Sequence, residues 1–173
     1  MSTDVFLVLT VIGDDRPGLV GELAAAIAEH QGNWLESSMS HLAGKFAGIV
    51  KVAVPAAQAA ALQAALGRLA TLKVVAEASE PKSAATGRRL KLALVGHDRI
   101  GIVREVSQVL ARFAVNVENL ETHTASAPMS AETLFHAQAE LVAEGGLDAR
   151  ALKTELERLS DDLMVDITLD ETI

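Results

Sequence analysis

The sequence contains no cysteine and few aromatic residues, and these absences limit what the protein can be. Without cysteine there are no disulfide bonds and no thiol chemistry, and the commonest ligands of structural zinc are missing. Aromatic residues make up 3% of the 173 residues and hydrophobic residues 50%, so any core must be aliphatic. No apolar run approaches the roughly 18 residues that a membrane-spanning helix needs. The composition indicates an aliphatic interior and no membrane span.

Basic charge is also scarce. The chain has 15 Lys and Arg residues against 23 Asp and Glu residues, a formal net charge of −8. It lacks a basic stripe of the kind that contacts phosphate backbones, so we expect no direct binding to nucleic acid. The N-terminal segment has no basic leader, and its apolar run over residues 5–12 ends in acidic residues rather than at a small-residue cleavage site. We therefore expect a strand there and a cytoplasmic location.

The chain repeats itself at an offset of 83 positions. The segment IGDDRPGLVGEL, residues 12–23, returns as VGHDRIGIVREV, residues 95–106. The match extends to an asparagine in each copy, Asn33 and Asn116. Two copies at so long a period indicate a duplicated domain rather than a solenoid.

A segment of different composition separates the copies. The stretch SEPKSAATGRR, residues 79–89, has no large apolar residue and contains proline and glycine, as linkers do. We therefore expect a first domain at residues 1–80, a linker at residues 81–88 and a second domain at residues 89–173.

Each copy shows the same series of apolar patterns. A near-continuous apolar run, typical of a buried central strand, is followed by helical spacing, two strand-like segments, a second helical pattern and a last strand. The expected strands cover residues 5–12, 33–40, 46–54 and 72–79, then 90–95, 116–123, 134–142 and 163–170. The order βαββαβ, with right-handed crossovers, puts both helices on one face of a four-stranded antiparallel sheet.

This pattern predicts an α+β protein of two ferredoxin-like domains. One face of each sheet is left uncovered. Because so small a domain buries a limited share of its surface, we expect the units to pair side by side or face to face, within the chain or in a homo-oligomer.

The repeated turn joins the first strand to the first helix of each copy, where free backbone N–H groups and the helix dipole favour an anion. Gly18 and Gly101 lack a Cβ, which permits an unusual backbone angle or close approach of a ligand carboxylate. A structural explanation stands beside this one and is favoured for the aspartates. Asp15 and Asp98 are candidates for the N-cap of the helix, and Pro17 suits its first turn.

The asparagine before each second strand also has two interpretations. It could serve as a C-terminal cap or turn residue. Alternatively, its amide could both donate and accept hydrogen bonds to a small zwitterion.

The turns DRPGLV and DRIGIV, each followed by an aliphatic helix and an asparagine, resemble those of the ACT domain, a βαββαβ module that commonly binds amino acids at domain interfaces. A tandem pair of this length is most similar to the glycine cleavage system transcriptional repressor family. The segment NVENLETHTASAPMSAETLF, residues 116–135, supports this because its strand connection is lengthened around residues 124–132.

The resemblance implies a non-enzymatic regulator without a cofactor. Such a protein senses glycine or a similar small amino acid and acts through a partner transcription regulator. Ile100 replaces a proline and His97 replaces Asp14 in the second copy, so the two sites need not be equivalent. The implied ligand contacts are Asp15, Arg16, Pro17, Gly18 and Asn33 in the first copy, and Asp98, Arg99, Ile100, Gly101 and Asn116 in the second.

Two other functions remain open. One is a protein–protein interaction module that uses an open sheet face or edge without a ligand. The other is an acylphosphatase-like enzyme, although the chain lacks that family's glycine- and arginine-bearing loop and any apparent nucleophile–base pair. No metal site is expected, because the histidines neither pair at helical spacing nor recur in the repeat: His30, His41, His97, His123 and His136.

Overall fold

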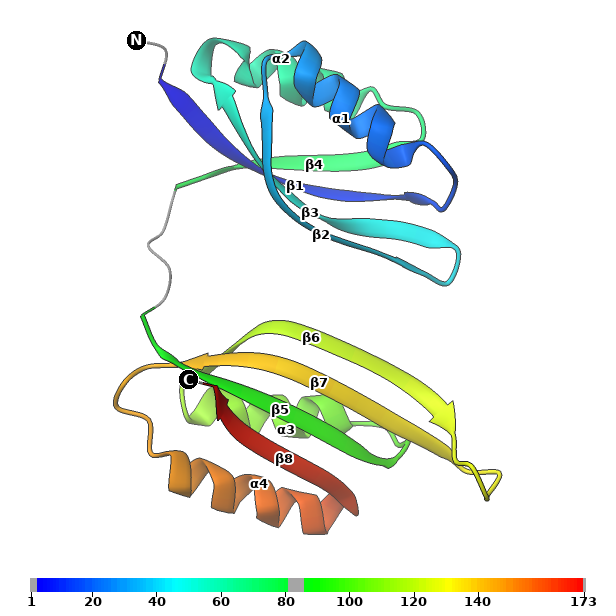
Figure 1. The fold of residues 1–173 in the computed structure, drawn as a ribbon, viewed down its shortest axis with the longest axis vertical. Coiled ribbons are helices and arrows are strands. Elements are labelled where there is room, and N and C mark those ends of the chain that lie inside the picture. The colour runs from blue at the N-terminus through cyan, green and yellow to red at the C-terminus, as the bar shows by residue number, and fades with distance from the viewer. Residues whose placement is uncertain (1–2, 81–85, 173) are drawn as a thin grey trace. The chain divides into compact units, whose positions relative to one another are not determined.

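The computed structural model describes residues 3–80 and 86–172, which fall into two compact units. Both units have the element order βαββαβ that the sequence predicts (Figure 1). The first contains β1 (Asp4–Asp14), α1 (Leu19–Glu29), β2 (Asn33–Leu42), β3 (Lys45–Pro55), α2 (Ala56–Gly67) and β4 (Leu72–Ser79). The second contains β5 (Arg88–His97), α3 (Ile102–Arg112), β6 (Val115–Ser126), β7 (Thr133–Ala143), α4 (Ala149–Leu163) and β8 (Val165–Thr172).

Each unit is built on one four-stranded antiparallel sheet. The strand orders are β2-β3-β1-β4 and β6-β7-β5-β8, so the apolar strands β1 and β5 are central as predicted. Both helices of a unit lie on the same face of its sheet (Figure 1). The ferredoxin-like fold is therefore confirmed for both copies.

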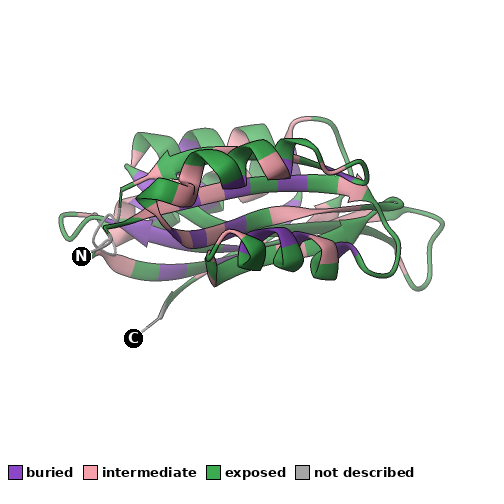
Figure 2. Ribbon diagram, turned by 90° about the horizontal axis from the view of Figure 1, so that it is seen from above, coloured by how far each residue is buried: buried purple, intermediate pink, exposed green. Residues whose placement is uncertain are grey.

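The core of each unit lies between its sheet and its helices. In the first unit Leu7, Leu9 and Val11 of β1 are at most 2% exposed and pack with Leu23 and Leu62 of the helices. The alternation of buried and exposed residues along the strands is visible in Figure 2. The alternate residues of β1 point to the other face, which neither α1 nor α2 covers, so within this unit the apolar run at residues 5–12 is buried on one side only.

The structure changes some expected boundaries and keeps others. Ser79 ends β4, as expected for the strand at residues 72–79, whereas Arg88 of the expected linker begins β5. Residues 81–85 of that linker lie outside the described residues. The predicted last strand at residues 163–170 begins too early, because Leu163 still belongs to α4 and Met164 ends that helix with a left-handed φ of 52°.

The connections between the middle strands differ as expected. In the first unit β2 and β3 are joined by the two residues Ala43 and Gly44, whereas residues 127–132 join β6 and β7. Met129 in this longer connection is fully exposed. No helix in the described part of the chain is long and apolar enough to cross a membrane.

Candidate functional site

The repeated turn has the same backbone in both units. Gly18 and Gly101 form the N-caps of α1 and α3 with φ of 94° and 99°, a left-handed conformation that residues with a Cβ adopt at a cost. Among the described residues no side chain caps either helix. Both helix N-termini therefore present unsatisfied N–H groups.

The predicted capping role of the aspartates is wrong. Asp15 and Asp98 lie three residues before the N-cap, and their backbone N–H groups donate instead to the carbonyls of Gly44 and Thr133, each at 2.9 Å. Pro17 likewise precedes the N-cap rather than entering the first turn. These residues therefore belong to the connection that precedes each helix, and the glycine is the N-cap of the helix.

Both arginines of the turns contact a glutamate in the first turn of the following helix. Arg16 pairs with Glu22 at 2.5 Å, and Arg99 pairs with Glu105 at 3.4 Å. The Thr71 hydroxyl also donates to Glu22. This hydrogen bond and the one from Arg16 lower the pKa of the Glu22 carboxyl. The guanidinium groups are thus partly neutralised beside the helix N-terminus.

In the first unit the turn borders a hollow of about 210 Å³, which we call the turn hollow. A Cβ placed on Gly18 would meet no described atom within 4 Å. Sequence reasoning identified three of the lining residues but missed the helix positions and Phe46, which arrives from β3. The lining residues are Asp15, Arg16, Gly18, Leu19, Val20, Gly21 and Phe46.

The corresponding turn of the second unit is more crowded. A Cβ on Gly101 would lie 3.4 Å from Oε1 of Glu105 and 3.5 Å from Nη2 of Arg104. Ile100, which stands in place of Pro17, is fully exposed. The two turns share a backbone but differ in the space beside it.

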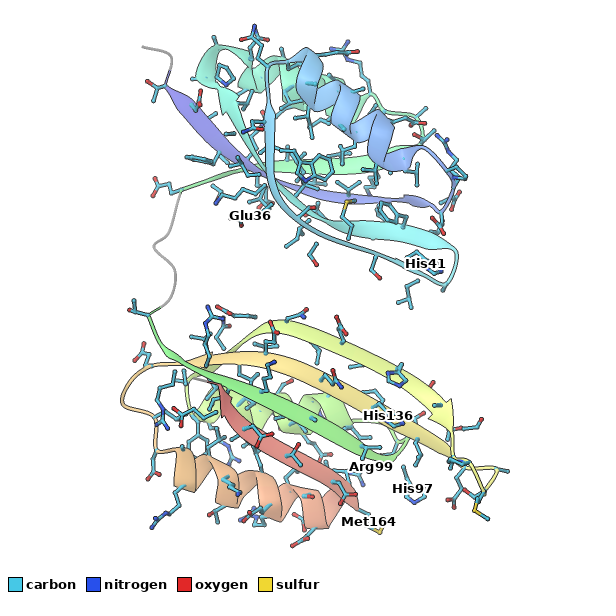
Figure 3. All side chains as sticks on the ribbon, in the orientation of Figure 1. Glu36, His41, His97, Arg99, His136 and Met164 are labelled. Atoms are coloured by element: carbon cyan, nitrogen blue, oxygen red, sulfur yellow. The ribbon has the colours of Figure 1, made fainter. Side chains whose placement is uncertain are left out.

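The residues just before the two turns differ in type and in the neighbour that each contacts. Asp14 of β1 pairs with Lys45 of β3, and this contact lowers the pKa of the Asp14 carboxyl. In the second unit His97 of β5 lies 3.6 Å from Glu132, and Figure 3 shows His97 and Arg99 at this end of the strand. The carboxylate beside the turn is therefore Asp14 of β1 in the first unit and Glu132 of the β6–β7 connection in the second.

The asparagines lie far from the turns of their own units. Asn33 is opposite Ala53, which pairs with Phe6, whereas Asp14 pairs with Lys45 at the other end of the same ladder. Eight residues of strand separate Phe6 from Asp14, about 26 Å at 3.3 Å per residue. Within one unit, a single small molecule cannot contact both the asparagine and the turn.

The second unit shows the same separation. Asn116 pairs with Val142, which faces Arg89, eight positions before His97. The capping role considered for the asparagines is also wrong. The left-handed residues after α1 and α3 are Gln31 and Ala114, and Asn33 and Asn116 already belong to strands.

Two hollows larger than the turn hollow lie away from the predicted residues. Two shallow depressions of about 340 and 280 Å³ occupy the uncovered face of the second sheet. His123 and His136 stack there with ring centroids 4.7 Å apart, and Figure 3 shows His136 on this sheet. The described residues contain no group of three or more His, Asp or Glu side chains placed to hold a metal ion.

Comparison with known proteins gives consistent matches. Residues 5–75 match the family model of the ACT domain. A crystal structure of a protein described only as unknown, from Galdieria sulphuraria, is similar with a TM-score of 0.85 and 31% identity, over 99% of this chain and 100% of that one. A protein provisionally named a glycine cleavage system transcriptional repressor has a TM-score of 0.74 and 19% identity, over 99% of each chain. No curated protein matches the sequence.

Proposed function

The chain belongs to the ACT-domain family, and from this premise we propose that it is a regulatory protein that senses a small amino acid at the turn between β1 and α1. The observation that carries the proposal is the uncapped N-terminus of α1 beside the turn hollow. Glycine, or an amino acid of similar size, is the proposed ligand. The proposed role is regulatory rather than catalytic.

The chemistry of the turn hollow suits a zwitterion. Backbone N–H groups of the first helical turn, at Leu19 and Val20, are donors for a carboxylate at the positive end of the helix dipole. The carboxylate of Asp15 offers an acceptor for the ammonium group. Phe46 supplies an apolar wall, which favours a ligand with a short side chain.

The first unit is the stronger candidate for binding. Its turn is open at Gly18, whereas Glu105 and Arg104 lie close to Gly101 in the second unit. Asp98, Arg99 and Ile100 would then have a structural role. The asparagines can join a ligand site only where a second domain brings one of them beside a turn.

We further propose that the protein acts through a partner transcription regulator. A net charge of −8 disfavours contact with a phosphate backbone, so a separate protein would read the DNA. Ligand binding changes such an interaction only if the ligand has different affinities for the free and partner-bound states.

Calorimetric titration with a panel of amino acids, including glycine, serine and the branched-chain residues, tests the ligand. Gly21→Leu should abolish binding, because it places a side chain at the turn hollow from a helical position where a Cβ meets no described atom within 4 Å. The matched control is Gly67→Leu in α2, which has the same free space but lies outside the hollow. Equal losses in both variants, or no binding of any amino acid at millimolar concentration, would remove the proposed site.

The partner is tested separately. The wild-type protein should not bind duplex DNA at moderate salt, and it should retain a transcription regulator in pull-down experiments with an effect of the bound amino acid. Direct binding to DNA would contradict this part of the proposal and leave the ligand site intact.

A further inference from the structure

The uncovered face of the first sheet carries exposed apolar side chains around Thr10 at its centre. Ile12, Ile49 and Val75 are 42%, 54% and 48% exposed, and they come from three different strands. Val8 and Phe6 of β1 point to the same side and are half-buried. We call this surface the first open face. An apolar surface that spans several strands marks an interaction site on a soluble domain.

The equivalent face of the second unit has a different character. The position matching Ile49 beside the central strand holds Gln138, and the position matching Val75 holds Thr168. Because the same fold carries a polar face in one copy, the fold itself does not require apolar residues here. The apolar character belongs to the first unit alone.

The charged residues of the first open face lie on the edge strands β4 and β2 and on the inner strand β3. Lys73 and Glu77 flank Val75 on β4. Near the other side, Lys51 lies 3.9 Å from Glu36 and 5.7 Å from the Phe6 ring, so its charge is already engaged. Figure 3 shows Glu36 on this sheet.

Two copies of the first open face are complementary when one particular two-fold axis relates them. A two-fold axis that crosses the strands through Ile49, Thr10 and Val75 places each of these residues opposite its own copy and Val8 opposite Ile12. It also places Lys73 of each copy opposite Glu77 of the other copy, which gives two ion pairs. A two-fold axis along the strands, midway between β3 and β1, would instead place Glu36 opposite Glu77, which like charge disfavours.

The sheet of the second unit does not offer this match. The positions of Lys73 and Glu77 are held by Asp166 and Asp170, which pair with Val95 and Lys91 as their counterparts pair with Ile12 and Val8. The same rotation would bring two pairs of carboxylates together.

We propose that the first open face binds a second copy of this chain, face to face, about the axis that crosses the strands at Val75. The two sheets pack at the usual separation of about 10 Å, with apolar side chains around Thr10 at the centre and two Lys73–Glu77 pairs at the rim. The resulting dimer does not depend on the proposed ligand.

A charge-reversal cycle tests the geometry. Lys73→Glu and Glu77→Lys should each weaken the dimer at least about tenfold in sedimentation equilibrium, because each change places like charges opposite each other. The double variant should recover wild-type affinity. Lys73 and Glu77 lie four residues apart on one strand, about 13 Å. A recovered affinity in the double variant therefore cannot come from a contact between the two side chains of one chain.

A second pair of variants tests the apolar centre. Val75→Glu should make the protein monomeric, since the axis brings the two introduced carboxylates together. Val103→Glu is the matched control, because Val103 is 43% exposed but lies on α3 of the second unit. Circular dichroism establishes that both variants fold. A monomeric wild-type protein, a dimer that resists Val75→Glu, or a double charge variant that stays monomeric would each overturn the proposal.

Discussion

Gly18 and Gly101 are 83 residues apart and hold one backbone conformation, although the side chains around them have diverged. The shared conformation is therefore the part of the turn that both units need. Gly18→Ala should lower the free energy of unfolding by about 1–2 kcal/mol, because a Cβ is unfavourable at a left-handed φ. Gly21→Ala, three residues later in the helix, should raise it by about 0.5–1 kcal/mol. Urea denaturation followed by circular dichroism checks both, and effects of the same sign would contradict the assignment.

The one-sided burial of β1 gives a second prediction. Leu9 is fully buried, so Leu9→Ala should cost about 2–5 kcal/mol in the free energy of unfolding. Ile12→Ala, on the uncovered face of the same strand, should cost about 1 kcal/mol or less at protein concentrations that keep the chain monomeric. Chemical denaturation at low concentration makes the comparison. Equal costs would mean that the uncovered face is buried in the folded chain.

The Glu22 carboxyl gives a pH dependence. Its pKa is lowered in the folded protein by the hydrogen bonds from Thr71 and Arg16. The resulting stabilisation is present above the ordinary glutamate pKa of about 4.3 and is lost as the pH falls through the lowered value. Glu22→Gln should therefore lose less stability than wild type between pH 6 and pH 3. Glu29→Gln, at the other end of α1, is the control for the removal of one carboxylate from this helix.

Arg88 and Glu171 join the first and last strands of the second unit through two parallel bonds of 2.8 and 2.9 Å. Arg88 also donates to the carbonyl of Leu147 at 3.1 Å. Arg88→Lys keeps the positive charge but cannot form the two parallel hydrogen bonds to the Glu171 carboxylate. Backbone amides of β8 should therefore exchange hydrogen faster. Arg104→Lys on α3 is the control, since that side chain is 72% exposed. Unchanged exchange in β8 would show that the pair does not hold the strand.

The repeat made the fold predictable. Because the same apolar spacings occur twice, each copy confirms the other's elements, and the central positions of β1 and β5 followed from their apolar runs. The end of α4 was not predictable in the same way. Leu163 and Met164 fit either a helix end or a strand start, and only the left-handed backbone at Met164 decides between them.

The turn was only partly predictable. Asp15 is a good capping residue by type, but its role depends on the residue at which the helix begins, and that residue is Gly18. Phe46 reaches the hollow because β3 pairs with β1 in a register that places it opposite Gly13, which no local pattern reveals. The distance from Asn33 could have been inferred, since a βαβ crossover returns the chain to the end of the sheet where the first strand began.

Trp34 packs against the core of the first unit, at the start of β2, and it is the chain's single tryptophan. The chain also has no tyrosine, so its indole emission comes from one of two units that share a fold. On one sample, tryptophan fluorescence thus follows the unfolding of the first unit, whereas far-ultraviolet circular dichroism follows the unfolding of the whole chain. Curves that fail to coincide would give the order in which the two copies unfold, without a label or a truncated chain.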